Sequence, residues 1–569
     1  MGNASPDTVA TAYLALLADR GVDYLFGNAG TDFAPLLEAY AQGMQGAGSM
    51  PRPILATHEN LAVTMAHGYA MVSGRIPAVM VHVSVGTANM LCGAMNAARE
   101  NVALLLTAGR SPITETGLPG ARDGYIHWAQ EMYDQAGIMR EMVKWDYELR
   151  NPEQLATVVD RALAIAATEP RGPVYLTLPR EVLAARMPHD ARPAPRRLHA
   201  AAPAGPDPVA VSAAADMIAE AEKPLIVTSN AGRDPQAFLR LGKFAERCGV
   251  PVVQHKPRYL SIASSHPMNL GYDPHRLIAE SDLIVSLEAD VPWLRTRAEP
   301  RPHCKVIQAG FDPLFTGIPI RGFPCDLGLT GAPAAILKAL IDQVVERSAE
   351  AVLQRRRNWA AERRAALHAD WAAARQAAAN RVPIELAWIS HCLDRAKHPS
   401  AIVINEYSLA LEHCGFEAPE CFFGASSASG LGWGAGAALG AKLAAPERQV
   451  VAVLGDGAFM FANPAAVHHS AKLHDLPVLL VIVNNSMWNA VRQSTIAMYP
   501  NGRAAQSNDA PFMRLEGLPP YEQICTAAGG YGERVEDPAA LPEAMARALK
   551  IVETERRHAL LNVICEAAA

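Results

Sequence analysis

The chain has 569 residues, of which 50% are hydrophobic and 19% are charged, and its formal net charge is -6. This is ordinary globular composition, long enough for three or four domains or for two large ones. We expect no nucleic-acid partner, because phosphate binding needs clustered Lys and Arg and no long basic run is present.

Nine cysteines are scattered along the chain and none forms a Cys-x-x-Cys pair, so neither a zinc site nor a disulfide framework is predicted. The N-terminus has no charged segment followed by an apolar one, which argues against a signal peptide. No apolar run reaches the ~20 residues that a membrane span needs. The sequence therefore predicts a soluble cytoplasmic protein with reduced thiols and no membrane partner.

The first block, residues 1–185, alternates helical and apolar strand-like segments, which is typical of a mostly parallel sheet. A helix is expected at Thr8–Asp19. Strands are expected at Tyr24–Gly27, Ala78–Val83, Val102–Ala108 and Val174–Leu178.

A connector follows at residues 186–208, where six prolines argue against any helix or central strand. The second block, residues 209–345, again indicates a doubly wound sheet. Its strands are expected at Leu225–Thr228, Val250–Val253, Leu283–Leu287 and Lys305–Gln308.

Residues 346–383 are predicted to be a helical linker, because Ser348–Asn380 contains no Gly or Pro and Pro383 follows it. The arginine cluster Arg355–Arg357 is interpreted as a solvated helix face. The third block, residues 384–569, has strands expected at Ile402–Asn405, Val450–Leu454 and Val478–Val483. The predicted fold is α/β, with three doubly wound parallel-sheet domains.

Polar residues follow two of these third-block strands immediately. The first strand leads into Gly455-Asp456-Gly457-Ala458, and the second into Asn484-Asn485-Ser486-Met487, with one helix of about two dozen residues expected between them. Ligands bind at the carboxyl ends of strands in open parallel sheets. Glycine lets the backbone approach a phosphate, and carboxylate and amide oxygens suit magnesium. The pair of motifs therefore predicts a cradle for a diphosphate and Mg²⁺.

These motifs resemble the cofactor signature of the thiamine-diphosphate (ThDP) dependent decarboxylase and acetolactate synthase superfamily. The resemblance implies ThDP and Mg²⁺ as cofactors. It also implies magnesium ligation by Asp456, Asn485 and the backbone oxygen of Met487. The three domains would then be the pyrimidine-binding, central and diphosphate-binding domains of that family.

The resemblance extends to the first block, where Thr57-His58-Glu59-Asn60 is similar to the family's segment around a glutamate. It implies that Glu59 binds N1′ of the cofactor's aminopyrimidine and so activates the cofactor. Such a role needs a carboxyl group in a pocket of low dielectric, where it can share a proton. By itself Glu59 would be interpreted as a helix N-terminal carboxylate.

Four further segments resemble the benzoylformate decarboxylase branch. Asn28 and Thr31 lie in a Gly-Asn-x-Gly loop, which implies that they line the substrate pocket, and His82 stands where the branch has a histidine, a candidate proton shuttle. Leu431, in Ser429-Gly-Leu-Gly-Trp433, would wedge between the two rings of the cofactor. Ser408, after the first strand of the third block, would contact the cofactor.

The sequence also departs from this branch, which has a second active-site histidine in its central domain. The comparable segment, Glu288–Leu294, has no histidine, and Trp293 is expected to form a bulkier wall of the pocket. Trp488 and Gln493 are expected to line the pocket as well. His468 and His469, on the expected crossover helix, are interpreted as structural.

We therefore expect a carbon–carbon lyase or ligase that acts on a 2-oxo acid, as a decarboxylase or carboligase. An alternative is a 2-hydroxyacyl-CoA lyase, in which Arg233, Arg258, Arg295 and Arg297 hold a nucleotide. A non-catalytic ThDP-binding subunit is a third hypothesis. The resemblance implies a homo-oligomer, a dimer or tetramer, with the active site at the dimer interface.

Overall fold

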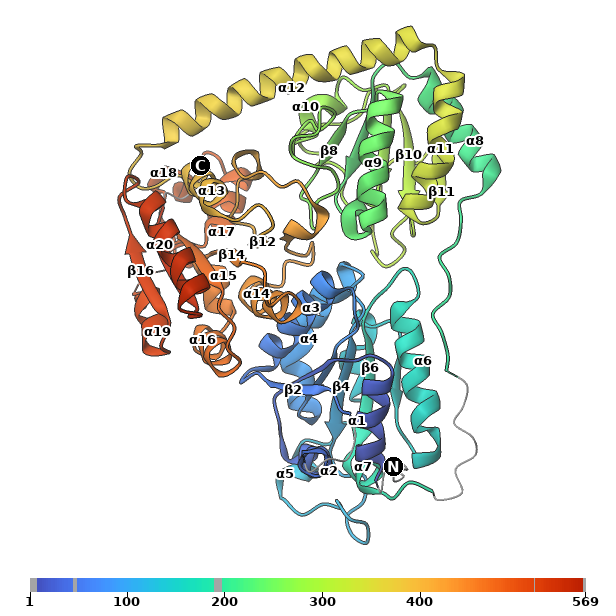
Figure 1. Ribbon diagram of the computed structural model, residues 1–569, viewed down its shortest axis with the longest axis vertical. Helices are drawn as coiled ribbons and strands as arrows, with labels where there is room; N and C mark the ends of the chain where they lie inside the picture. The colour runs from blue at the N-terminus through green and yellow to red at the C-terminus, as the bar shows by residue number, and fades with distance from the viewer. Residues whose placement is uncertain (1–7, 45–48, 189–196, 516, 566–569) are drawn as a thin grey trace.

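The computed structural model describes the chain except for residues 1–7, 45–48, 189–196, 516 and 566–569. It contains three parallel sheets, each flanked by helices, so the predicted fold class is confirmed. In Figure 1 the first domain lies at the bottom, the central domain at the upper right and the third domain at the left. Part of the predicted connector, residues 189–196, lies outside the described residues.

The first domain has a six-stranded sheet in the order β2-β1-β3-β4-β6-β5. Its strands are β1 Tyr24–Gly27, β2 Arg52–Leu55, β3 Ala78–Val81, β4 Leu105–Arg110, β5 Asp146–Glu148 and β6 Val174–Pro179. Its α-helices are α1 Val9–Asp19, α2 Ala34–Gly43, α3 Glu59–Ser73, α4 Val83–Arg99, α5 Ile126–Ala129, α6 Leu155–Ala167 and α7 Arg180–Ala184. The edge strands β2 and β5 lack the long apolar runs by which the inner strands were predicted.

The central domain has a five-stranded sheet in the order β11-β10-β9-β7-β8. The strands are β7 Pro224–Thr228, β8 Val252–Gln254, β9 Leu283–Leu287, β10 Lys305–Gly310 and β11 Leu327–Thr330. The helices are α8 Pro208–Glu220, α9 Pro235–Cys248, α10 His275–Ile278 and α11 Pro333–Arg347.

A single long helix, α12 Glu350–Ala378, runs from the central to the third domain (Figure 1). The interpretation of its arginine cluster as solvated is wrong for Arg356, which is 1% exposed. The Arg356 guanidinium donates to the backbone oxygens of Ile218, Ala221 and Cys248. It thereby satisfies carbonyls at the ends of α8 and α9 that have no partner within their helices.

The third domain has a six-stranded sheet in the order β13-β12-β14-β15-β17-β16. The strands are β12 Ile402–Glu406, β13 Phe422–Gly424, β14 Val450–Gly455, β15 Leu479–Asn484, β16 Tyr531–Val535 and β17 Ala559–Ile564. The helices are α13 Leu386–Ala396, α14 Trp433–Ala444, α15 Asp456–Phe461, α16 Pro464–Leu473, α17 Asn489–Met498, α18 Arg503–Ser507, α19 Tyr521–Ala527 and α20 Leu541–Thr554.

The single crossover helix predicted between the two polar motifs is wrong, because the structure divides it into α15 and α16. Asn463 has a left-handed backbone with φ +58°, and Pro464 opens the second helix. Proline has no N–H for the helix ladder and fits the first turn of a new helix, so the break occurs there.

Helices α3 and α14 join the first and third domains by close packing. A Cβ on Gly68 would collide with the backbone of Ala437, and one on Gly440 would collide with the backbone of Met65. Buried side chains of both domains, including Val63, Trp433 and Leu439, belong to one continuous core. The two domains therefore share a hydrophobic core although the central domain separates them in sequence.

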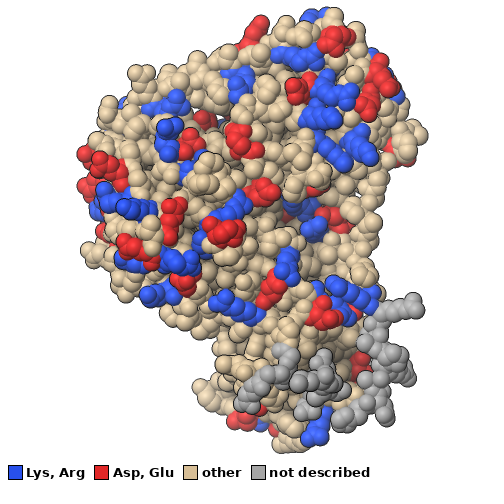
Figure 2. Space-filling view, viewed as in Figure 1, with Lys and Arg blue, Asp and Glu red and all other residues tan. Residues whose placement is uncertain are grey.

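Lys and Arg are interspersed with Asp and Glu over the face shown in Figure 2. Among the described residues, no helix is both long enough and apolar enough to cross a membrane.

Candidate active site

The two polar motifs of the third domain lie side by side, because β14 and β15 are neighbours with Gly455 opposite Val483. Asp456 begins α15 and is 2% exposed. Its Oδ1 accepts a hydrogen bond from the Gly457 N–H at 2.9 Å, whereas its Oδ2 is buried without a partner. A buried oxygen with no donor costs free energy, so this carboxylate is prepared for a ligand.

The electrostatics of Asp456 agree with that geometry. Burial raises the pKa of Asp456 from 3.8 to about 6, and nearby backbone N–H groups oppose the shift only in part. The Asn485 side-chain oxygen accepts from the Met487 N–H at 3.0 Å, which fixes the loop after β15. Two oxygen ligands suited to a hard cation thus follow neighbouring strands.

Small residues keep the space around these strand ends open. A Cβ on Gly457 would overlap the ring of Trp488, and one on Gly455 would lie 3.4 Å from Ser408 Oγ. Ala458 is buried in the first turn of α15. The structure therefore brings Ser408, Gly455–Ala458 and Trp488 together at this edge of the sheet.

Glu406 organises the loop that carries Leu431. The Glu406 carboxylate accepts backbone hydrogen bonds from Gly432, Trp433 and Gly434 at the start of α14, at 2.8, 3.3 and 2.7 Å. Burial raises its pKa to about 6, and these three donors oppose the shift. A carboxylate at a helix N-terminus is a favourable arrangement that fixes the preceding loop. Leu431 is half-buried beside the core shared by the two domains.

Glu59 lies in the first domain, apart from the third-domain residues described above. It is the first residue of α3 and is 8% exposed. Asn28 Nδ2 donates to Glu59 Oε1 at 3.1 Å, and Asn89 Nδ2 donates to Oε2 at 3.0 Å. Two amides from different elements therefore hold the carboxyl group in one orientation.

His82 forms a partly buried pair with Asp32, a residue that the sequence did not single out. His82 Nδ1 lies 2.6 Å from Asp32 Oδ1, and His82 Nε2 lies 3.3 Å from Gln130 Nε2. Since a carboxylate only accepts hydrogen bonds, Nδ1 is the donor. Asp32 is 2% exposed, whereas the His82 side chain is 17% exposed. The ring is therefore held by Asp32 at Nδ1 and by Gln130 at Nε2, and part of the side chain remains exposed.

The backbone around this pair is unusual. Val83 has φ +30°, a conformation that a β-branched residue rarely adopts. Its N–H donates to Asp32 Oδ2 at 3.3 Å, which offsets part of the strain. A Cβ on Gly30 would overlap the His82 ring, and one on Gly109 would overlap Asp32. Both glycines thus leave room for the His82–Asp32 pair.

The other pocket candidates differ in exposure. Thr31 and Gln493 are exposed, on the turn before α2 and on α17. The expectation that Trp293 forms a pocket wall is wrong, because its ring is 0% exposed and packs edge-on against Phe323 in the central-domain core.

Family models match all three domains. The N-terminal thiamine pyrophosphate (TPP) binding domain of thiamine pyrophosphate enzymes matches residues 7–138, the central domain matches 211–340, and the C-terminal TPP binding domain matches 406–563. The chain belongs to the thiamine pyrophosphate enzyme family. The resemblance found in the motifs is therefore confirmed, and so is ThDP as the cofactor.

Curated members of this family align over most of the chain. A probable 2-ketoarginine decarboxylase from Pseudomonas aeruginosa is 28% identical, covering 86% of this chain and 84% of the relative. Benzoylformate decarboxylase from the same organism is 26% identical over 98% of both chains. The acetolactate synthase isozyme 3 large subunit of Escherichia coli is 25% identical over 95% of this chain and 92% of its own length.

Solved thiamine enzymes share the fold. A ThDP-dependent 4-hydroxybenzoylformate decarboxylase from Rhodococcus jostii superposes with a TM-score of 0.78 at 20% identity, covering 99% of both chains. Benzoylformate decarboxylase from Polynucleobacter necessarius gives a TM-score of 0.79 at 20% identity, also over 99% of both chains.

The family site thus falls into two groups within one chain. Glu59 makes its described side-chain hydrogen bonds with first-domain residues, and Asp456 lies among third-domain residues. The sequence analysis assigned no role of their own to Asp32, Asn89, Gln130 and Glu406. Asp32 and Glu406 adjoin residues that were singled out, but pairing across 50 residues, as between Asp32 and His82, leaves no local signal.

Proposed function

We propose that this thiamine enzyme is a Mg²⁺-dependent 2-oxo acid decarboxylase or carboligase. The observation that carries the proposal is the His82–Asp32 pair beside the Asn28–Gly30 loop, which also holds Glu59. The candidate proton-handling group and the candidate cofactor-activating carboxyl group thus both contact this one loop. The names of the decarboxylase and acetolactate synthase relatives agree with this reaction class.

Asp456, Asn485 and the backbone oxygen of Met487 are the proposed Mg²⁺ ligands. The support is the buried Asp456 Oδ2 without a partner and the hard oxygen character of the donors. Gly455, Gly457, Ala458 and Ser408 would contact the diphosphate. When bound, ThDP supplies a nucleophilic carbon and an electron sink.

Glu59 is proposed to share a proton with the aminopyrimidine, because Asn28 and Asn89 fix its carboxyl group in a buried pocket. His82 is proposed to give or take a proton through Nε2, the nitrogen not held by Asp32. Thr31, Trp488 and Gln493 are the proposed substrate-pocket residues. Leu431 is proposed to support the bent cofactor.

For the 2-hydroxyacyl-CoA lyase alternative, three of the four arginines expected at a nucleotide already have carboxylate partners. Arg233 pairs with Glu169 at 2.8 Å in a partly exposed ion pair, and Arg258 pairs with Asp290 at 2.8 Å in a buried one. Arg295 pairs with Glu299 on the surface. These three arginines serve separate ion pairs, which favours the 2-oxo acid reaction over the lyase alternative.

Product analysis by mass spectrometry tests the proposed function. Purified protein with ThDP and Mg²⁺ is incubated with aliphatic, aromatic and guanidino 2-oxo acids and, separately, with 2-hydroxyacyl-CoA thioesters. An aldehyde or acyloin from an oxo acid is expected. Formyl-CoA and a carbonyl compound, with no product from any oxo acid, would move the protein to the lyase reaction.

Asp32→Asn is expected to lower kcat for oxo acid turnover by about 10–100-fold. Loss of a residue that orients a functional histidine typically has an effect of this size. The amide no longer offers a charged acceptor to His82 Nδ1 and releases the ring. Steady-state kinetics measure the effect, while ThDP affinity and hydrogen–deuterium exchange at C2 of bound ThDP remain unchanged. Unchanged kcat, or equal loss of ThDP affinity, would contradict the assigned role.

Magnesium-dependent ThDP binding is expected to weaken below pH 6, roughly tenfold per pH unit, because a proton competes for Asp456. Burial raises the folded pKa of Asp456 above its ordinary 3.8 to about 6. Since the folded chain binds this proton more tightly than the unfolded chain does, the proton on Asp456 stabilises the fold. That stabilisation is complete below pH 3.8 and is lost as the pH rises through 6. Titration calorimetry at pH 5 and 7 measures the binding.

Asp456→Asn is the control, because the diphosphate itself still titrates in that variant. The difference in pH dependence between the wild type and Asp456→Asn isolates the carboxyl group. Identical pH slopes in the two proteins would show that Asp456 carries no competing proton.

A homodimer, or a tetramer built from dimers, is the proposed assembly, with the partner's Glu59 pocket facing the diphosphate site. Its support is a set of strongly exposed apolar side chains in the first and third domains: Tyr125, Tyr133, Met498, Tyr499 and Phe512. Exposed apolar surface of this kind marks an interaction site. Cytoplasmic localisation is proposed from the reduced, buried thiols of Cys248, Cys392 and Cys414.

A further inference from the structure

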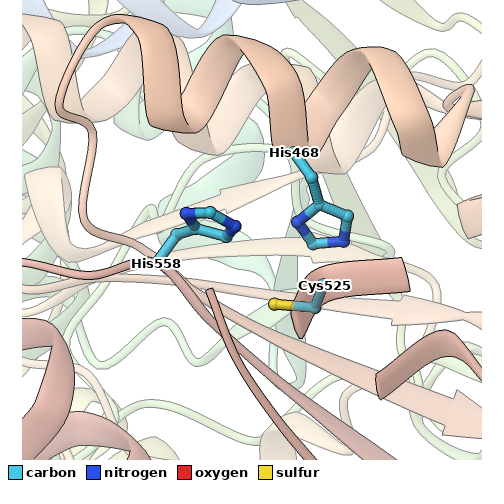
Figure 3. Close-up of side chains that lie close together, drawn as sticks. All are labelled: His468, Cys525 and His558. Carbon is cyan, nitrogen blue, oxygen red and sulfur yellow. The ribbon is translucent and has the colours of Figure 1, made fainter. Parts of the chain in front are cut away.

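Two histidines and one cysteine converge in the third domain, near the amino ends of β16 and β17 (Figure 3). His468 comes from α16, Cys525 from α19, and His558 immediately precedes β17. One donor atom from each residue lies within 4.8 Å of those of the other two. Among the described residues, this is the one group of three such side chains placed closely enough to share an ion.

The cluster is buried and its hydrogen bonding is incomplete. His468 and Cys525 are 0% exposed. Both ring nitrogens of His468 and the Nε2 of His558 have no hydrogen-bond partner. Each buried polar atom left without a partner costs about 1–3 kcal/mol. The interpretation of His468 as merely structural leaves this cost without compensation, since an apolar side chain would fill the same space.

The protonation states suit metal coordination. Burial lowers the pKa of His468 to about 3 and that of His558 to about 4, so both imidazoles are neutral and have free lone pairs at neutral pH. Burial raises the pKa of the Cys525 thiol to about 12. An ion binding to this sulfur must therefore displace the thiol proton, which leaves to solvent as the sulfur–metal bond forms.

We propose that His468, Cys525 and His558 bind a thiophilic late-transition-metal ion through two imidazole nitrogens and one thiolate. Such ions hold nitrogen at about 2.0–2.1 Å and sulfur at about 2.3 Å, which brings the donors to roughly 3.3–3.8 Å from one another. The donor atoms, which lie within 4.8 Å of one another, would approach to that separation when the ion binds. Sulfur and imidazole ligands select Cu⁺ or Zn²⁺ over Mg²⁺, so this site is chemically distinct from the cradle at Asp456.

Charge favours the monovalent ion. One thiolate neutralises Cu⁺, whereas Zn²⁺ leaves a net positive charge in a buried space. The nearby positive charges of Lys472 and Arg557 already lower the pKa of His558. An additional buried positive charge is therefore costly. Zn²⁺ would also need a fourth ligand, such as water, to complete its tetrahedral shell.

The site is connected by packing to the cofactor cradle. The His468 ring packs against the Phe459 ring, with ring centres 5.9 Å apart. Tyr521, one turn before Cys525, packs edge-on against the Phe459 ring as well, at 5.3 Å. Phe459 lies on α15, the short helix that Asp456 begins. An ion that joins α16, α19 and the residue before β17 would therefore stabilise the two helices that pack against Phe459 of α15.

Metal retention tests the proposal in the reduced protein saturated with ThDP and Mg²⁺. Cu⁺ and Zn²⁺ are added anaerobically in separate arms against chromophoric chelators, and bound metal is measured after gel filtration. One equivalent is expected in at least one arm, with an X-ray absorption spectrum of one sulfur and two nitrogens and with a raised unfolding temperature. The arm that retains metal identifies the ion.

Variants separate this site from any other metal. Cys525→Ser and His468→Gln are expected to weaken retention by at least about 100-fold. Cys248→Ser is the matched control, because Cys248 is also a buried thiol that donates to a backbone oxygen. The proposal is overturned by sub-stoichiometric metal in both arms, or by a sulfur-free ligand shell in the wild type. The ligand shell of the wild-type protein tests the proposal even if a variant does not fold.

Discussion

Glu59→Gln is expected to slow hydrogen–deuterium exchange at C2 of bound ThDP by about 10²–10⁴-fold, the usual contribution of a positioned acid–base group. Glutamine fills the same pocket and still accepts from Asn28 or Asn89, but it cannot share a proton with the cofactor. Acid-quenched exchange monitored by NMR measures this step without knowledge of the substrate. Turnover of any oxo acid should fall in parallel.

The matched control is Glu38→Gln, the same substitution at an exposed glutamate of α2. It should leave both exchange and turnover at wild-type rates. Titration calorimetry should find ThDP bound by Glu59→Gln. An exchange rate within twofold of the wild type would mean that Glu59 does not activate the cofactor, and a folded variant with full biological effect would favour a non-catalytic subunit.

Asp456→Ala is expected to abolish turnover and to weaken Mg²⁺-dependent ThDP binding by at least about 100-fold, more than loss of an outer partner costs. The variant removes the buried carboxylate whose Oδ2 has no protein partner. Its cofactor-free form should be at least as stable as the wild type above pH 6, because an unpaired buried charge is destabilising. Chemical denaturation and calorimetry measure the two effects separately.

Asp475→Ala provides the comparison, since Asp475 is an exposed aspartate of the same domain that pairs with Arg556. It should bind ThDP as the wild type does. If Asp456→Ala binds ThDP normally, the cradle does not hold the cofactor through this residue. If it unfolds when cofactor-free, Asp456 serves the fold more than the site.

The sheets were predictable because their inner strands are continuous apolar runs that end in polar residues, as at Val450–Gly455 and Leu479–Asn484. The edge strands were not predictable, because Arg52–Leu55 and Tyr531–Val535 are partly exposed and carry polar side chains. The break at Asn463 was missed because Pro464 can either end one helix or begin another.

Within the candidate site, residues that belong to a local sequence motif were predicted from the sequence. Residues that matter because they contact a side chain far away in the sequence were not. Gly-Asp-Gly and Asn-Asn mark Asp456 and Asn485 locally. Asp32, in contrast, acquires its place only when β3 brings His82 beside it. Trp293 was misassigned because local sequence does not reveal which side of a loop faces the core.

The glycine-mediated packing of α3 against α14 has a consequence for the chain as it leaves the ribosome. The face of α3 near Gly68 packs against Ala437, which is synthesised roughly 370 residues later. At a translation rate of about 5–20 residues per second, that interval lasts roughly 20–70 s. The N-terminal sheet can form early, but the apolar face that α14 covers in the folded protein stays exposed to solvent while the whole central domain is translated. Nascent chains of this protein therefore present a target for chaperones that recognise exposed apolar helices, and translation arrest before α14 should yield an aggregation-prone product.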